Sequence, residues 1–214
     1  MQETIRGVIV KIPVAGSSKI CLLTREYGKV PVVVFNQYQR ARMRLGNIVQ
    51  SFVQQDQYNM FVADSVELIA QPHVHHHDLG WFHHLLEISY FFCPMHQPAS
   101  EVYVILEKSL SLLQVHYEQK SSWALVQISL VGCLLILFGF YPPAPFEIVL
   151  NPINRLLAMT IDFHQPQNLE LLTCSAAMLQ EHDLDQYHAW LLACIKTHPR
   201  ISGFKTLPFV YKTI

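Results

Sequence analysis

Residues 71–78 read Gln-Pro-His-Val-His-His-His-Asp and divide the sequence into two parts with different hydrophobic patterns. Before this stretch the apolar residues gather in short β-branched runs, which is typical of strands. After it they recur every three or four residues, which is typical of helices. The stretch therefore predicts an α+β protein of two domains, a β domain at residues 1–72 and a helical domain at residues 78–214.

Five runs of the N-terminal part predict strands, and turn signals such as Tyr27-Gly28 separate them. Five short strands are the number found in an OB-type barrel, a small Greek-key barrel that binds oligonucleotides in many proteins. We therefore expect an OB-fold, nucleic-acid-binding β-barrel over residues 1–72. Its strands are expected at residues 5–12, 19–24, 29–35, 47–53 and 60–68.

Five runs with helical spacing follow Asp78, which is a suitable N-cap for the first of them. Pro94 ends the first run, and a proline-rich stretch at residues 142–145 ends the third. We therefore expect an all-α domain over residues 78–214. Its helices are expected at residues 79–93, 100–117, 122–140, 169–181 and 183–197.

The third helical run contains nineteen residues without a charge, from Trp123 to Tyr141. Its length and apolarity match those of a membrane-spanning helix. However, it is the only such run, Gln127 and Ser129 lie in its first half, and no basic cluster flanks it to set an orientation. A central helix covered by its neighbours explains the same pattern. Both interpretations fit these residues, and the family resemblance described below favours a buried helix with no membrane contact.

Composition limits the class of protein. Hydrophobic residues make up 51% of the 214 residues and charged residues 14%, which argues against a disordered chain. The five cysteines are widely spaced and form no CxxC pair, so we expect neither a disulfide framework nor a cysteine zinc site. The N-terminus lacks the apolar core of a signal peptide. These features predict a cytoplasmic protein.

Six histidines lie within residues 73–84 beside Asp78, and imidazole with carboxylate suits zinc or nickel. Their spacing matches no metal-binding template, and a solvated linker is the simpler explanation, so we expect no metal site. The sequence also lacks GxSxG, HExxH and glycine-rich phosphate motifs. We therefore expect no cofactor and no enzymatic activity.

The strongest functional signal is the segment Phe35-Asn36-Gln37-Tyr38-Gln39-Arg40-Ala41-Arg42-Met43-Arg44. Its three arginines at every second position can meet successive phosphates, while the aromatic rings offer faces for bases. Residues 1–70 contain eight Lys or Arg against five Asp or Glu, whereas the rest contains seven against eleven. A solvated loop that only keeps the barrel soluble is the alternative interpretation.

The order of segments resembles the RecO family of bacterial DNA-repair and recombination mediator proteins. In the first domain the resemblance rests on the opening Gly7-Val8-Ile9-Val10, on Leu22-Leu23-Thr24 followed by Glu26-Tyr27-Gly28-Lys29, on the basic stretch 40–44, on Gln50-Ser51-Phe52 and on residues 64–68. In the second domain it rests on Leu85-Leu86-Glu87 within residues 79–90 and on the run 122–141, which closes in Gly139-Phe140-Tyr141-Pro142.

The resemblance implies an OB-fold barrel joined to a helical domain that binds single- and double-stranded DNA and promotes strand annealing. It also implies that the protein works with a RecR-like protein and the single-strand-binding protein, and thereby helps to load RecA. We expect the basic edge of the barrel to contact DNA through Arg40, Arg42 and Arg44 at its centre, Arg25 and Lys29 at its flank, and Phe35 and Tyr38 as stacking residues.

Two departures from the family pattern affect this interpretation. Many family members carry a four-cysteine zinc motif after the Gly-Tyr-x-Pro ending, whereas residues 142–157 contain no cysteine here, so no structural zinc is expected. The family's Lys-Gly-Ala-Arg element is replaced by Asn36-Gln37-Tyr38-Gln39-Arg40, with one basic group fewer. A barrel-plus-helices module that binds only protein partners is therefore the second interpretation.

Overall fold

The computed structural model describes residues 2–12, 17–56, 60–74, 78–112, 120–143, 166–176 and 181–206, with positions 146, 147, 150, 151, 153 and 155. Residue contacts divide the chain into two compact units, Met1–His73 with Cys93–Tyr103 and Val74–Phe92 with Val104–Ile214. The division after His73 falls within the break expected at residues 71–78. The second predicted domain, residues 78–214, was wrong in one respect, because Cys93–Tyr103 belongs to the first unit.

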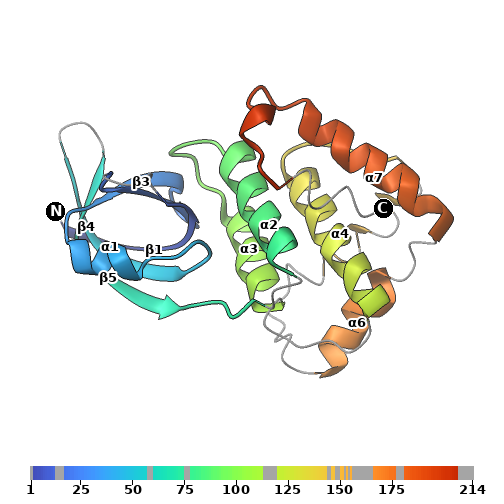
Figure 1. The fold of residues 1–214 in the computed structure, drawn as a ribbon, viewed down its shortest axis with the longest axis horizontal. Coiled ribbons are helices and arrows are strands. Elements are labelled where there is room, and N and C mark those ends of the chain that lie inside the picture. The colour runs from blue at the N-terminus through green and yellow to red at the C-terminus, as the bar shows by residue number, and fades with distance from the viewer. Residues whose placement is uncertain are drawn as a thin grey trace. The chain divides into compact units, whose positions relative to one another are not determined.

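The first unit contains the five predicted strands: β1 (Gln2–Lys11), β2 (Lys19–Thr24), β3 (Gly28–Val34), β4 (Ile48–Gln55) and β5 (Phe61–Ala70). They pair in the cyclic order β1-β2-β3-β5-β4, so the sheet closes on itself (Figure 1). β3 and β5 run parallel, from Val32 opposite Phe61 to Val34 opposite Ala63, and the other neighbouring pairs are antiparallel. Strands followed by helices confirm the predicted α+β class.

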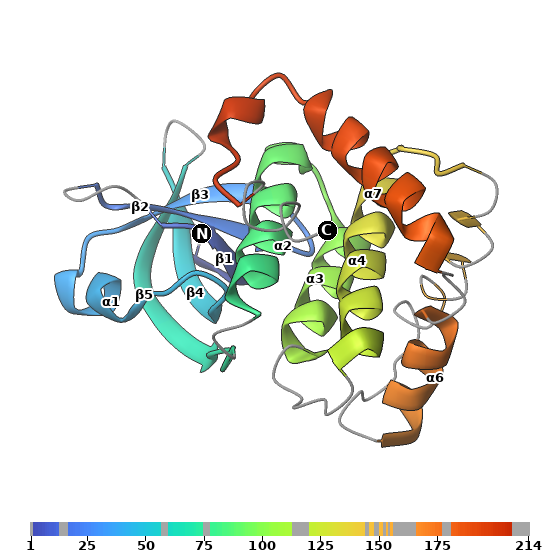
Figure 2. The ribbon, with the colours of Figure 1, turned by 45° about the vertical axis from the view of Figure 1, so that its right-hand side comes forward.

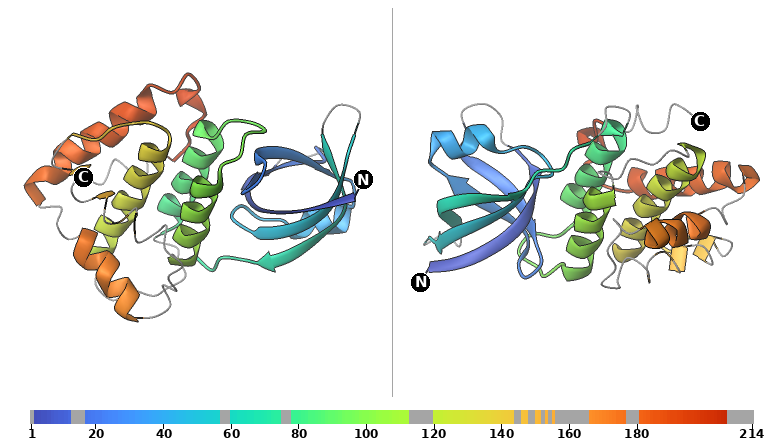
Figure 3. Two further views of the ribbon diagram at one scale, coloured as in Figure 1. Left: turned by 180° about the vertical axis from the view of Figure 1, so that it is seen from behind. Right: turned by 90° about the horizontal axis from the view of Figure 1, so that it is seen from below.

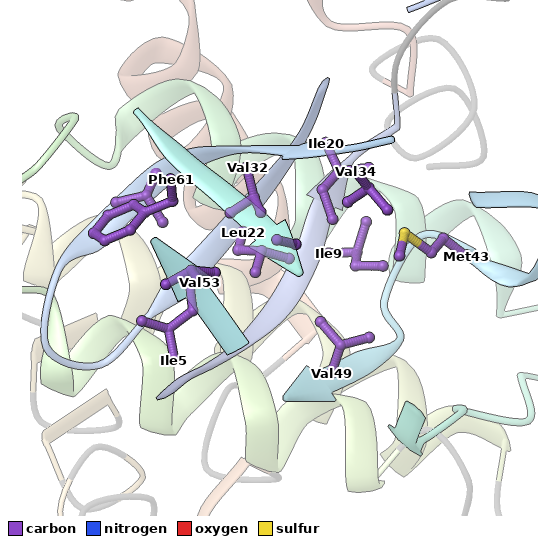
Figure 4. Close-up of a cluster of buried hydrophobic side chains, with 12 residues drawn as sticks. Ile5, Ile9, Ile20, Leu22, Val32, Val34, Met43, Val49, Val53 and Phe61 are labelled. Atoms are coloured by element: carbon purple, nitrogen blue, oxygen red, sulfur yellow. The ribbon is translucent and has the colours of Figure 1, made fainter. Parts of the chain in front are cut away.

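The interior of the barrel is filled by alternate residues of each strand, because successive side chains of a strand point to opposite faces. Figure 4 shows this cluster, with Met43 at one edge beside Ile9 and Val49. Each fully buried aliphatic side chain of this kind contributes about 1.5–3 kcal/mol to stability. The cluster consists of Ile5, Ile9, Ile20, Leu22, Val30, Val32, Val34, Met43, Val49, Val53, Phe61 and Ala63.

The segment 93–103 belongs to the barrel unit because it packs on the turn between β2 and β3. The amide N of His96 donates to the carbonyl O of Lys29 at 3.0 Å, and the amide N of Ala99 donates to that of Arg25 at 3.4 Å. Gly28 has φ 62°, and a Cβ placed on it would lie 1.7 Å from the carbonyl O of Gln97. Only glycine therefore fits at the start of β3.

The second unit is built around α4 (Lys120–Leu137), which α2 (Leu79–Phe92), α6 (Pro166–Ala176) and α7 (Glu181–Lys196) contact (Figures 1 and 2). α3 (Ser100–Leu112) begins in the first unit, and a short 3-10 helix, η1 (Ile201–Gly203), follows α7. The five predicted helices are present, with ends shifted by a few residues; positions 113–117 and 177–180 of two of them lie outside the described residues.

The apolar run forms the middle of this helix cluster. Every residue from Val126 to Leu135 is buried. A Cβ on Gly132 would lie 1.9 Å from the hydroxyl O of Tyr187, so α4 and α7 approach closely there. Gly139, with φ 87°, ends α4 in the left-handed conformation that favours glycine. Among the described helices, none has the length and apolarity needed to cross a lipid bilayer.

Two buried polar pairs connect elements of the second unit. Gln127 Nε2 of α4 donates to Asp78 Oδ1, just before α2, at 2.6 Å. His84 Nδ1 of α2 lies 2.8 Å from Thr206 Oγ1. Complete burial lowers the pKa of His84 to about 3, so the folded state keeps the imidazole neutral.

Replacement of Gly28 by alanine should lower the free energy of unfolding by at least about 3 kcal/mol, because a positive φ and a clash with backbone act together. Gly139→Ala is the matched control, since it also has a positive φ but no atom within 4 Å of the added Cβ, and should cost about 1 kcal/mol. Urea denaturation followed by circular dichroism measures both. Equal losses would contradict the close approach of Gln97.

Acid should destabilise the protein through His84. Its pKa is lower in the folded state than the ordinary 6.5, so its stabilising effect is complete above pH 6.5 and is lost progressively as the pH falls toward 3. Between pH 7.5 and pH 5.0 this group alone should remove about 2 kcal/mol. His84→Gln keeps a polar partner for Thr206 and should lose about 2 kcal/mol less over the same range, measured by urea denaturation at each pH. Parallel pH profiles would refute the assignment.

Candidate nucleic-acid interface

The strand register gathers five basic residues at one end of the barrel. Lys11 ends β1 and Lys19 begins β2, and the amide N of Val34, at the end of β3, donates to the carbonyl O of Ser18 at 2.8 Å. The helix α1 (Gln37–Arg42) follows β3 directly and is seen from further sides in Figure 3. We call this end of the barrel, with Lys11, Lys19 and residues 35–44, the basic end.

Local capping explains why residues 36–43 form a short helix. Asn36 is the N-cap, and its Oδ1 accepts from the amide N of Tyr38 at 3.0 Å and of Gln39 at 3.2 Å. Met43 then returns to an extended conformation and enters the barrel core, where it is 5% exposed. The buried thioether therefore anchors the C-terminal end of α1 to the barrel.

Two of the three predicted arginines also bind backbone groups. Arg40 Nη1 donates to the carbonyl O of Ser17 at 3.2 Å, which connects α1 to the residues before β2. Arg44 Nη1 donates to the carbonyl O of Ala41 at 2.8 Å and of Met43 at 3.0 Å. A guanidinium has five N–H groups, so each keeps donors for a phosphate. Arg42 is exposed.

The two predicted stacking residues are exposed. Phe35 is 69% and Tyr38 86% accessible to solvent, at the end of β3 and in the first turn of α1. An exposed aromatic ring leaves apolar surface in water unless something covers it. Next to cationic side chains, such rings are the stacking platforms used by proteins that bind single-stranded nucleic acid.

Charge is unevenly distributed over the barrel. The basic end has one carboxylate, Glu67, among the described residues, together with five cations: Lys11, Lys19, Arg40, Arg42 and Arg44. The opposite end has three carboxylates, Glu3, Glu26 and Asp56, with Arg25 and Lys29, whereas Asp64 lies between the two ends, because its neighbour Ala63 pairs with Val34 at the end of β3. Sequence reasoning missed Lys11 and Lys19, because only the pairing of β1, β2 and β3 brings them to α1.

Arg25 and Lys29 do not flank the arginines of α1, and their predicted placement is wrong. They lie in and just after the turn before β3, whereas α1 follows the other end of that strand, about 20 Å away for seven extended residues. Lys29 is also only 8% exposed. Arg25 is exposed, but it shares its end of the barrel with acidic residues such as Glu26.

One hydrogen-bonded polar pair lies at the opposite end of the barrel, and a second joins β4 to β5 between the two ends. Tyr27 Oη donates to Glu3 Oε2 at 2.9 Å, and this hydrogen bond raises the pKa of Tyr27 above its ordinary value. Gln54 Nε2 donates to Asp64 Oδ2 at 2.9 Å. The carboxylates at the opposite end make it unfavourable for a polyanion.

A pocket of about 310 Å³ opens beside α1, and we call it the α1 pocket. Its walls come from α1, from the residues that lead into β4, and from β4 and β5. It is lined by Gln39, Arg42, Met43, Asn47, Val49, Val66, Glu67 and Leu68. Four of these residues are apolar and four are polar or charged.

The described residues contain no cluster of metal ligands, and two of their buried cysteines, Cys21 and Cys194, are protonated. No group of three or more His, Cys, Asp or Glu gathers among them, and His75, His76 and His77 lie outside the described residues. Burial raises the pKa of Cys21 to about 12 and that of Cys194 to about 11, so both thiols are protonated at neutral pH. The protonated thiol is a poor nucleophile.

No family model matches the sequence, and no curated protein matches it with significance.

Arg44→Ala should lower the free energy of unfolding by about 1–2 kcal/mol, because it removes hydrogen bonds from a charged donor to two carbonyl groups at the end of α1. Arg42→Ala, two residues earlier on the exposed side of α1, should change it by less than about 0.5 kcal/mol. Urea denaturation distinguishes the two variants. Equal stability of both variants would contradict the capping role of Arg44.

Proposed function

We propose that the protein binds DNA through the basic end of its barrel and acts as a RecO-like mediator of DNA repair and homologous recombination. The observation that carries this proposal is the joint presence of five cationic side chains and two exposed aromatic rings at one end of a small closed barrel. Polyanion binding needs the first feature, and base stacking needs the second.

The strand arrangement supports an OB-type assignment of the barrel. Five strands in the order β1-β2-β3-β5-β4, with a helix inserted after β3, match the small Greek-key barrels that bind single strands and oligosaccharides. The residues proposed for DNA are Phe35, Tyr38, Arg40, Arg42 and Arg44 from the sequence, together with Lys11 and Lys19.

Physical chemistry indicates how this end would hold a strand. Each phosphate neutralised by a Lys or Arg releases condensed counterions, which gives an affinity that falls with salt and does not depend on sequence. Tyr38 and Phe35 would stack on bases, worth about 1–3 kcal/mol for each stacked base. Neither the phosphate contacts nor the stacking requires a duplex, so both single- and double-stranded DNA are expected ligands. Single strands gain the stacking energy in addition.

The role in recombination rests on the family resemblance. It implies strand annealing and cooperation with a RecR-like protein and the single-strand-binding protein, which in turn help RecA to load on DNA. Such work takes place in the cytoplasm and involves no catalytic step by this chain. We therefore propose a cytoplasmic DNA-binding protein without enzymatic activity.

A protein-interaction module without DNA binding is the second candidate. The observation that favours it is apolar exposure at the end of β5, where Leu68 is 42% and Ile69 45% accessible to solvent. Exposed aliphatic neighbours of this kind occur at protein interfaces. The two candidates differ in salt dependence, because an apolar interface binds its partner with little change as salt rises.

Fluorescence anisotropy with a labelled oligonucleotide at several salt concentrations tests the proposal. Replacement of Lys11, Lys19 and Arg42 by glutamine should weaken single-strand binding by at least about tenfold at low salt. It should also flatten the slope of log affinity against log salt by about two units, because a single strand releases about 0.7 counterion per phosphate contact. These three side chains are exposed, so the thermal midpoint should change little.

The matched control replaces Arg25, Lys196 and Lys205 by glutamine. These side chains are also exposed and carry the same total charge, but none belongs to the basic end. The control variant should keep its affinity to within about twofold and keep its salt slope. Equal weakening of both variants would show that the loss of affinity depends on net charge alone and not on the basic end. A wild-type protein that binds no DNA would favour the protein-interaction module.

A further inference from the structure

One face of α1 presents two exposed groups side by side. Tyr38 and Arg42 are four residues apart, and residues at this spacing are neighbours on a helix surface, with about 5–6 Å between their Cβ atoms. Tyr38 is 86% accessible to solvent, and Arg42 is also exposed. Among the described residues, Tyr38 makes no ring contact and Arg42 no ion pair, although Glu67 lines the α1 pocket with it. A ring and a guanidinium are therefore both available at one place.

Ala41 completes this face of α1. It lies three residues after Tyr38 and directly before Arg42, and it is exposed. A long side chain at this position would lie against the ring of Tyr38, because residues three apart are also neighbours on a helix surface. The single methyl group of alanine leaves the ring uncovered there. We call Tyr38, Ala41 and Arg42 the α1 platform.

Side chains satisfy the last carbonyl groups of α1. Such groups have no partner within a helix and carry partial negative charge, which would repel a phosphate near Arg42. Arg44 Nη1 donates to the carbonyl O of Ala41 at 2.8 Å and to that of Met43 at 3.0 Å. Asn47 Nδ2 donates to the carbonyl O of Arg42 at 3.4 Å. The positive charge of Arg44 thus offsets the partial negative charge at this end of α1, so that the end can accept an anion.

The other side of α1 is fixed to the barrel. Met43 is 5% exposed and lies in the barrel core, and Arg40 Nη1 donates to the carbonyl O of Ser17 at 3.2 Å. Figure 2 shows α1 at the outer edge of the barrel. A surface that is already held in place loses little conformational freedom when it binds a ligand.

We propose that the α1 platform binds one nucleotide of a DNA strand as a unit, with the base stacked on Tyr38 and its phosphate bonded to Arg42. This inference rests on the proposed DNA binding and adds to it which base contact and which phosphate contact belong together. The base and the phosphate of a nucleotide are covalently linked, so once one of them is bound the other is already close to its partner. Loss of the phosphate contact should therefore weaken the stacking, whereas loss of a phosphate contact elsewhere on the basic end should not affect it.

Two labelled oligonucleotides of equal length separate the stacking from the phosphate contacts. One is oligo(dT) of about ten nucleotides, a length within the usual site size of an OB fold, and the other consists of abasic deoxyribose units with the same number of phosphates. Anisotropy titrations of the full-length protein should give an affinity at least about tenfold higher for oligo(dT), because only its bases can stack. We call this ratio of affinities the stacking ratio.

Arg42→Gln and Lys19→Gln form a matched pair, because each removes one exposed cation of the basic end and Lys19 lies outside the α1 platform. Both variants should bind the abasic oligonucleotide about three- to fivefold more weakly at low salt. Arg42→Gln should also lower the stacking ratio by at least about threefold, whereas Lys19→Gln should leave it within about 1.5-fold of the wild type. Both side chains are exposed, so both variants are expected to fold.

Two variants of Tyr38 test the base contact itself. Tyr38→Ala should lower the stacking ratio to about threefold or less, because the ring on which the base stacks is lost. Tyr38→Phe keeps the aromatic ring and should retain the ratio of the wild type.

The outcomes distinguish the α1 platform from the proposed function. Binding of neither oligonucleotide by the wild-type protein would overturn the proposed DNA binding itself. A wild-type stacking ratio near one would leave the phosphate contacts in place and overturn the α1 platform. Equal stacking ratios in Arg42→Gln and Lys19→Gln would also overturn it, because the ring and the guanidinium would then act independently. A ratio that falls in Arg42→Gln and persists in Lys19→Gln supports the platform.

Discussion

The parallel pairing of β3 with β5 is the constraint on which the arrangement of the first unit depends. Because Val32–Val34 lie opposite Phe61–Ala63 in parallel, the two strands end on the same side of the barrel. β1 also ends on this side, since it is antiparallel to both β2 and β4. The end of β3 therefore places α1 at the same edge of the barrel as the last residues of β5, which include Leu68 and Ile69. Without this pairing, Arg42 of α1 and the residues of β5 would not line the same pocket.

The sequence was informative where a local pattern decides the structure. β-branched runs predicted the five strands, and helical spacing predicted the helices. Both patterns are local, because each depends only on which face of its own strand or helix is buried. The prediction of a core helix for the uncharged run 123–141 is confirmed for residues 126–135, which are buried in α4, whereas Tyr141 at the end of the run is exposed. The exposure of Phe35 and Tyr38, on which the stacking argument depends, was not predictable from their types.

Errors arose where non-local pairing decides the structure. Arg25 and Lys29 are near the arginines of α1 in the sequence, but an extended strand carries the chain about 20 Å between them. Lys11 and Lys19 are more distant in the sequence and yet lie at the same end, because the β1–β2 and β2–β3 registers place them there. The assignment of residues 93–103 to the barrel depends on backbone hydrogen bonds to Arg25 and Lys29, which no periodicity reveals.

The two ends of the barrel differ in charge, and the net charge of the whole chain conceals this difference. The whole chain carries a formal charge of -1, which predicts little attraction to a polyanion at long range. At physiological ionic strength the Debye length is about 8 Å, so a strand near the barrel senses mainly the charges of the end it approaches. Carboxylates such as Glu3 and Asp56 repel it at one end, and the cations around α1 attract it at the other. If DNA binds as proposed, the same short range would orient a strand only after it comes close, so binding would combine weak long-range steering with strong local selection of the surface. Neutrality over the whole chain and a basic surface at one end are therefore compatible, and the basic surface would decide where the proposed polyanion binds.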